Sequence, residues 1–373
     1  MKRLLFILVI LLSMLSCIDI KANVKKIAGY SYKYVDYKKG VWIINISKNN
    51  EKAENNGKST LVIPSSINGK KVLRLGSLGD DGKNDANVRN LFGVYEDEES
   101  EMGKRYSDKN SIVSKLHKIK IPATVSNISP YCFRYMGSGK EINIPKKVTK
   151  NLEQFCYGKW GKVTISKKNK KYISKKNMLL SKNGKIIYGY MGKEHNLILP
   201  ESVTQIARNA FEKKEISSVY LSKYVNKIGK YAFAYSNLSK IEISKKNKHY
   251  QVSNNCLFSK KSGRLLVAIA KKGTVIIPEG VTCLKDGTVF ISDKIQKIVF
   301  PKTISELKYG WQTVLYYDLD NINIIFKGTS APKETGGFPP GTKMYVPKGL
   351  ARKYISAYKT YIEYGTIKSI KEV

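Results

Sequence analysis

The chain has 373 residues and carries 67 Lys and Arg against 29 Asp and Glu, which gives a formal net charge of +38 at pH 7. A charge this large favours acidic partners. The three histidines fall in no H-E-x-x-H spacing, and the sequence has neither a G-x-S-x-G nor a G-x-x-x-x-G-K-[ST] motif. These absences argue against a zinc protease of that kind, a serine hydrolase and a P-loop nucleotidase. We therefore expect a protein that is not an enzyme and has no cofactor or metal site.

Residues 1–22 have the features of an export signal. Positive charge at the start is followed by an apolar run, Leu4 to Leu12, that is too short to cross a bilayer. Leu15-Ser16-Cys17 resembles a lipoprotein box, which would place a lipid on Cys17, and ordinary cleavage after Ala22 is the alternative. We favour lipidation. The protein is then exported, to the cell surface or outer membrane, and contacts the membrane only through its lipid anchor; a periplasmic or secreted protein is the alternative.

The rest of the chain repeats one short pattern, an apolar-x-apolar triplet that is often followed by Pro and then by Val and Ile or Leu. Copies recur about every 22 residues, and two intervals are about 34 residues long. A triplet that alternates in this way and is too short for a helix predicts a β-strand. Such a unit buries its apolar side only by stacking on its neighbours, which predicts a solenoid. Clear copies begin at Ile119, Ile142, Leu197, Val219 and Val275.

The two long intervals share an insert with the pattern Asn-x-x-Tyr followed by a short apolar run. It occurs at Asn169 to Lys182 and again at Asn247 to Lys260. Each insert turns at Asn183-Gly184 or Ser262-Gly263 and continues into a second apolar run. Because such pairs tolerate the positive φ of tight turns, both inserts are predicted to be β-hairpins.

A small residue followed by an aromatic one closes the second half of several repeats, as in Ala210-Phe211, Ala232-Phe233, Cys132-Phe133 and Cys156-Tyr157. With these pairs the repeat is similar to the unit of the BspA-type, or Treponema-type, leucine-rich repeats. The resemblance covers about residues 58–75 and 116–365. It implies a β-rich α/β fold, a right-handed leucine-rich repeat solenoid with a parallel β-sheet of about ten coils, two hairpin insertions and terminal caps.

The predicted organisation has five parts. After the signal come an N-terminal β cap with the first repeat (23–75), a polar and acidic insert (76–115), the repeat array (116–330), and a C-terminal repeat and cap (331–373). The small–aromatic turn is missing from the insert, and acidic residues cluster between Glu96 and Glu101. Few apolar residues are available there, so we expect the insert to be solvated.

The cysteines other than Cys17 have different settings. Cys132 and Cys156 occupy the small slot of adjacent repeats, where a core role and a disulfide are both compatible with a strand spacing of about 4.8 Å. Cys256 lies in an insert and Cys283 in a slot that is polar in other repeats. We expect these last two to be unpaired.

The outward residue of each triplet predicts a row across the stacked strands, which we call the middle row. It is polar at Lys120, Asn143 and Thr164, and mostly apolar from Ile198 on. The residues two positions earlier make a second row, the lysine row, which includes Lys140. The expected partner-binding residues are Ile198, Tyr220, Ile276, Val299, Ile325 and Tyr345 of the middle row, and Lys118, Lys162, Lys240, Lys297 and Lys343 of the lysine row.

An apolar row beside a cationic row suits a surface that buries against an acidic partner. Inserts that fold over the middle row are the alternative. Because the chain is expected to be exported, nucleic acid is a poor candidate, and an extracellular or envelope protein or an acidic polysaccharide is expected. The family resemblance implies a surface protein for adhesion or recognition. The competing interpretation is a scaffolding envelope lipoprotein that has no host ligand.

Overall fold

The computed structural model describes residues 22–48, 59–76, 91–92, 116–129, 132–133, 140–150, 152, 160–192, 194–212, 214–291, 295–308 and 321–373. The chain divides into two compact units, Met1–Asn151 and Leu152–Val373. Two predictions lie outside the described residues: the lipid anchor at Cys17 and the pairing of Cys156. Within the described residues there is no helix that is long and apolar enough to cross a membrane.

The first unit begins with three antiparallel strands, β1 (Asn23–Ile27), β2 (Tyr30–Tyr37) and β3 (Gly40–Lys48). Strand β6 (Lys70–Leu75) continues this sheet parallel to β3, with β5 (Ser66–Ile67) antiparallel and β8 (Asn127–Ile128) parallel to it. Strands β4 (Ser59–Val62), β7 (Leu116–Lys120) and β9 (Lys140–Ile144) pair in parallel. The parallel pairs are what stacked repeats require, because consecutive coils run in the same direction.

Part of the segment expected to be a solvated insert is packed in the first unit. Leu91 and Phe92 are buried in a turn, where Leu91 N donates to Cys132 O (2.8 Å) and Ile46 N donates to Leu91 O (2.9 Å). The expectation that the insert is solvated is therefore wrong at Leu91 and Phe92. Leu91-Phe92 was not predicted as a turn because the repeat pattern has a small residue before the aromatic one, and leucine is large.

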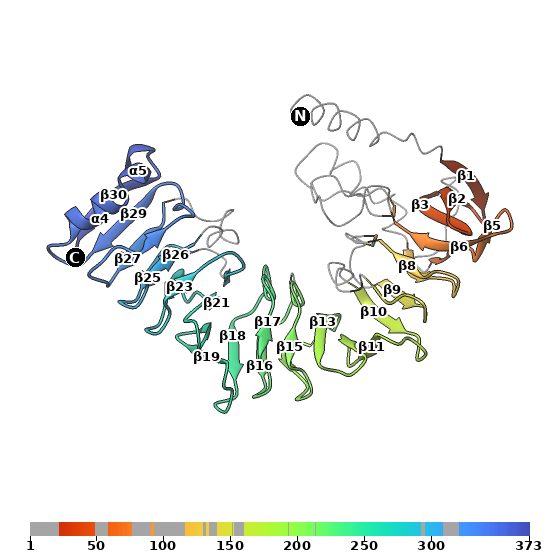
Figure 1. The fold of residues 1–373 in the computed structure, drawn as a ribbon, viewed down its shortest axis with the longest axis horizontal. Coiled ribbons are helices and arrows are strands. Elements are labelled where there is room, and N and C mark those ends of the chain that lie inside the picture. The colour runs from red at the N-terminus through yellow and green to blue at the C-terminus, as the bar shows by residue number, and fades with distance from the viewer. Residues whose placement is uncertain are drawn as a thin grey trace, which may run out of the picture. The chain divides into compact units, whose positions relative to one another are not determined.

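The second unit contains the regular coils of the solenoid (Figure 1). Each coil contributes one strand to the strand face and a shorter strand to its second half. The strand face has two parallel sheets: β14 (Asn196–Ile198), β16 (Ser218–Leu221) and β18 (Lys240–Ile243), and then β22 (Thr274–Ile276), β25 (Lys297–Phe300), β27 (Asn323–Phe326), β29 (Thr342–Val346) and β30 (Ile367–Glu372). Strand β10 (Trp160–Ile165) precedes them in the chain.

The short strands of the second halves also stack in parallel. Strand β15 (Gln205–Ile206) pairs with β17 (Lys227–Ile228), and β23 (Cys283–Leu284) pairs with β26 (Glu306–Leu307), which pairs with β28 (Lys333–Glu334). The predicted fold, a β-rich leucine-rich repeat solenoid, is confirmed in this arrangement.

Each insert is a set of three antiparallel strands rather than one hairpin. They are β11 (Tyr172–Lys175), β12 (Met178–Ser181) and β13 (Ile186–Tyr190), and β19 (Tyr250–Ser253), β20 (Cys256–Ser259) and β21 (Leu265–Ile269). The last strand of each set then pairs in parallel with the second half of the array, β13 with β15 and β21 with β24 (Val289–Ile291). The predicted turn at Asn183-Gly184 is present, with Gly184 at φ +69°.

The core is made by the residues that the repeat pattern places inward. Both outer residues of the triplets are buried, for example Val219 and Leu221, and the aromatic residues of successive turns stack, as Phe211 does on Phe233 with ring centroids 5.1 Å apart. At the C-terminal end, helices α4 (Ala351–Ala357) and α5 (Lys359–Glu363) close the array. Tyr354 and Tyr358 are buried there and donate to the backbone oxygens of Gly328 and Pro332 at 3.0 and 2.8 Å.

Candidate binding surface

The strand register places four apolar residues side by side in the C-terminal sheet. Ile276, Val299, Ile325 and Tyr345 pair in order across β22, β25, β27 and β29. We call these four residues the apolar row. Their neighbours on each strand point into the core, so the row faces outward, and Ile276 keeps 48% of its surface exposed. An apolar row across four strands is the feature that a patch for a partner would require.

A shorter outward row crosses β14, β16 and β18. Ile198 and Tyr220 are in register and are 73% and 39% exposed, and Glu242 follows them. Glu242 forms an ion pair with Lys240, whose Nζ lies 2.9 Å from Glu242 Oε1. The apolar character is therefore interrupted at β18, in agreement with the sequence, and resumes at β22.

The lysine row is in register with the apolar row. Thr274, Lys297, Asn323 and Lys343 pair across the same four strands, and both lysines are exposed. In the other sheet, exposed Lys240 follows Asn196 and Ser218. Adjacent strands are about 4.8 Å apart, so cationic and apolar side chains of the same strand face lie within reach of one partner.

The prediction that Lys140 belongs to the lysine row is wrong. The register pairs Lys118 with Glu141, and the two side chains form an ion pair at 3.0 Å. Lys140 is buried, and its Nζ donates to Leu116 O at 2.7 Å. Burial lowers the pKa of this amine. Lys162 on β10 is exposed, but Lys118 is partly neutralised by its partner.

The inserts do not cover the middle row. Their last strands pair with β15 and β24 in the second halves of the coils, and Ile198 and Ile276 remain exposed. The alternative in which the inserts bury this row is wrong. On the strand face of the second unit, Ile198, Tyr220 and Ile276 are exposed, and Val299, Ile325 and Tyr345 are partly exposed.

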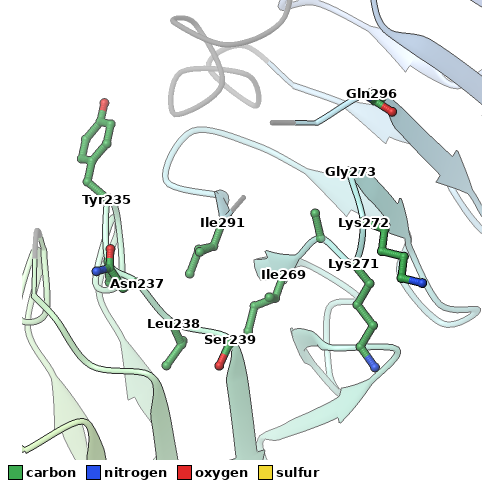
Figure 2. Close-up of a pocket in the computed structure, with 12 residues that line it drawn as sticks. Tyr235, Asn237, Leu238, Ser239, Ile269, Lys271, Lys272, Gly273, Ile291 and Gln296 are labelled. Carbon is green, nitrogen blue, oxygen red and sulfur yellow. The ribbon is translucent and has the colours of Figure 1, made fainter. Parts of the chain in front are cut away.

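A cavity of about 780 Å³ opens beside the start of the strands, where the second insert separates two coils (Figure 2). Figure 2 shows Leu238, Ile269 and Ile291 gathered around one space, whereas Lys271 and Lys272 extend away from it. Tyr235 and Gln296 lie at its exposed margin. Ser239 and Gln296 directly precede Lys240 and Lys297 of the lysine row. The cavity thus adjoins the strand face and was not predicted, because its walls come from residues that no repeat position brings together in the sequence.

The titratable residues show little sign of catalytic geometry. Within the described part of the chain, no group of three or more His, Cys, Asp and Glu residues is placed to hold a metal. His195 is exposed, and its Nδ1 lies 2.8 Å from Glu215 O. Cys256 is buried, and that burial raises the pKa of its thiol to about 12.

The cysteines agree with the expectation where the structure describes them. Cys256 and Cys283 form no disulfide, and Cys283 is partly exposed at the start of β23. Cys132 is buried in its turn, where its backbone N donates to Ser129 O at 3.3 Å. The pairing of Cys132 with Cys156 remains a prediction.

The fold and its coils define a leucine-rich repeat protein. The sequence profile of the BspA type leucine rich repeat region matches residues 110–176 and 184–311, in six copies. These ranges cover slightly more than half of the 373 residues. The chain belongs to the BspA-type leucine-rich repeat family, as the resemblance of its repeats predicted.

Solved structures of bacterial leucine-rich repeat proteins are similar at low identity. A leucine rich cell surface protein from Faecalibacterium prausnitzii A2-165 is 12% identical, with 94% of this chain and 95% of that one covered and a TM-score of 0.42. A leucine-rich repeat protein from Eubacterium ventriosum is also 12% identical, with 94% and 85% covered and a TM-score of 0.36. The pneumococcal vaccine antigen PcpA is 12% identical, with 94% and 98% covered and a TM-score of 0.32. No curated protein sequence matches the chain.

Proposed function

We propose that the chain is an exported, non-enzymatic surface protein of a bacterium that binds an acidic protein partner through the strand face of its second unit. The observation that carries the proposal is the apolar row, Ile276, Val299, Ile325 and Tyr345, in register on four adjacent strands. Outward apolar residues on adjacent strands form a contiguous patch, and such patches on soluble proteins mark interaction sites. Membership of a family of leucine-rich repeat proteins supports binding rather than catalysis.

A protein partner fits this face better than a polysaccharide alone. Lys297 and Lys343 flank the apolar row and attract acidic groups, while the row itself gains only from burying apolar surface, at about 25 cal/mol per Å². The cavity beside β18 and β22 has an apolar interior of Leu238, Ile269 and Ile291, which suits an anchoring side chain. An acidic peptide or protein surface with a large apolar residue offers all three features.

The test replaces the outward tyrosines of the two rows, exposed Tyr220 and partly exposed Tyr345. We expect Tyr220→Ser with Tyr345→Ser to weaken binding of the mature chain to an immobilised extracellular-matrix protein about tenfold or more, because buried tyrosines contribute strongly to interfaces. Surface plasmon resonance against a panel of matrix proteins and acidic glycans measures the change. Tyr224→Ser is the matched control, since Tyr224 is 47% exposed in the turn after β16 and belongs to neither row.

Two outcomes would contradict the proposal. An affinity that is the same in the double variant and in the Tyr224→Ser control rules out the strand face. Binding that high salt abolishes and the tyrosines do not affect indicates an acidic polysaccharide held by charge. The surface location is tested separately by adding protease to intact cells. Cleavage of the chain supports exposure on the cell surface, whereas protection favours a periplasmic scaffold.

A further inference from the structure

A second cavity lies on the opposite set of strands from the apolar row, where β23, β26 and β28 stack. Its volume is about 520 Å³, within the range of small-ligand pockets. Five basic side chains line it: Lys230, Arg264, Lys285, Lys308 and Lys333. Among the described lining residues there are two carboxylates, Asp286 and Glu306. The described lining therefore carries an excess of positive charge around one open pocket.

Both carboxylates are already engaged by neighbouring groups. Asp286 accepts from Lys230 Nζ and from Tyr231 OH, and Glu306 pairs with Lys308 at 2.8 Å. Among the described residues, Arg264, Lys285 and Lys333 have no ion-pair contact. Three cations thus remain for which the described residues supply no ion-pair partner.

Arg264 is held in place as a binding group would be. Its Nη2 donates to Asp286 O at 3.0 Å, while its Nε is buried and has no hydrogen-bond partner in the described part of the chain. Burial lowers the pKa of the guanidinium, against the opposing effects of Cys283, Tyr250 and Asp286. A partly buried charge with an unsatisfied donor is costly unless a counter-ion offsets it.

Parallel strands β23, β26 and β28 form one wall of the cavity. Cys283, Glu306 and Lys333 pair across β23, β26 and β28. The hydrogen bonding continues one residue further, because Lys308 N donates to Leu284 O at 2.8 Å and Thr335 N donates to Leu307 O at 3.0 Å. Lys285 and Lys308 therefore follow adjacent strands at the same level, about 4.8 Å apart in backbone spacing. Like charges in such neighbouring positions destabilise a sheet, and a shared anion would relieve that repulsion.

We infer that this cavity binds a sulfate or phosphate ester carried on a sugar, with Arg264, Lys285 and Lys333 as its cationic contacts. A guanidinium offers paired donors to a tetrahedral oxyanion, and the two ammonium groups add point charges. The cavity has room for a sugar ring next to the ester. This site is separate from the strand face, so it does not depend on the protein-binding proposal, and each can fail alone.

Isothermal titration calorimetry on the mature chain tests the site with two small probes. They are a sulfated heparin disaccharide and mannose 6-phosphate, each compared with its unsulfated or unphosphorylated counterpart. We expect at least one charged probe to bind and its neutral counterpart not to bind. The probe that binds more tightly identifies sulfate or phosphate as the group recognised. A native chain that binds neither charged probe overturns the inference.

Variants separate this site from the general charge of the protein. We expect Lys285→Gln with Lys333→Gln to raise the Kd for the charged probe about tenfold. Arg264→Gln should raise it by a similar factor. The side-chain ammonium groups of Lys285 and Lys333 make no hydrogen bond or ion pair with the described residues, so replacing them with glutamine should leave the fold intact by circular dichroism. Lys271→Gln with Lys272→Gln removes the same two charges from exposed positions outside the cavity. Equal weakening in both double variants shows attraction by net charge alone and overturns the inference.

Discussion

Two buried asparagines explain the Asn-x-x-Tyr pattern of the inserts. Asn247 is 1% exposed and makes four hydrogen bonds through its side chain. Its Nδ2 donates to the backbone oxygens of Ser222 and Val225 at 3.0 and 2.9 Å, and its Oδ1 accepts from the backbone N of His249 and Tyr250. Asn169 accepts in the same way from Lys171 and Tyr172. The asparagine thus ties the start of the insert to the coil before it.

We expect Asn247→Ala to lower the free energy of unfolding by about 2–3 kcal/mol, because it removes four hydrogen bonds, two of them buried, to backbone groups. Urea denaturation of the mature chain, followed by circular dichroism, measures the loss. Asn226→Ala is the control, since Asn226 is exposed and such substitutions stay within about 0.5 kcal/mol. Equal stability in the two variants would mean that the buried hydrogen bonds contribute nothing net.

The sequence predicted which residues point inward but not what the polar ones do. Alternation in the triplet was enough to place Val219 and Leu221 in the core and Tyr220 outside it. The sequence showed that an asparagine recurs at the position of Asn247 but not what it does, because its four hydrogen-bond partners are backbone atoms, which leave no pattern in the sequence. Lys140 was misplaced for a related reason: a shift of one position moves a strand residue to the other face.

At the scale of elements, the inserts lengthen a coil without interrupting the stack. The first two strands of each insert are joined by a tight turn whose two central residues have positive φ, Lys176-Asn177 and Asn254-Asn255. Two consecutive positive φ angles are typical of type I′ turns, which match the twist of paired strands. The later turns at Asn183-Gly184 and Ser262-Gly263 could be predicted, whereas Lys-Asn and Asn-Asn are weaker turn signals and did not mark the earlier ones.

The first turn of the second insert offers a test of this geometry. Asn255 has φ +57°, a conformation that β-branched residues strongly disfavour. We expect Asn255→Val to destabilise the chain by about 1–2 kcal/mol. Asn255→Gly relieves the same backbone constraint, so it should preserve stability or raise it slightly. Thermal and urea unfolding compare the two variants, and equal losses in both would place the cause in the side chain rather than in the turn.

The order of the strands on the strand face could be predicted from the sequence, but the position of the inserts could not. In the second unit, the order of residues in both outward rows followed from the repeat spacing, since consecutive coils stack in register. Where the inserts lie did not follow, because their pairing with β15 and β24 depends on contacts distant in sequence. The two cavities also escaped prediction, since they form where coils of unequal length meet.

At the scale of the whole molecule, either electrostatic attraction or a lipid anchor could hold the protein at a membrane, and the two respond differently to salt. A chain with a net charge of +38 adsorbs to anionic surfaces without any lipid. That attraction is screened within about 3 Å at 1 M salt. Two or more acyl chains, in contrast, hold through the burial of CH₂ groups at about 0.8 kcal/mol each, which salt does not weaken. Washing membranes with 1 M salt therefore separates the two causes.

We expect the native chain to stay with washed membranes and Cys17→Ser to be released, because serine cannot accept the thioether-linked lipid. Immunoblots of the membrane and soluble fractions measure the distribution, and mass spectrometry of the mature N-terminus identifies the acylated residue. Cys283→Ser is the matched control, since it removes a partly exposed thiol from the repeat array and leaves the signal intact. Retention of Cys17→Ser after the wash, or a mature chain that begins at Asn23, would replace lipidation by ordinary cleavage. In that case the basic surface, and not an anchor, would have to keep the strand face close to the cell.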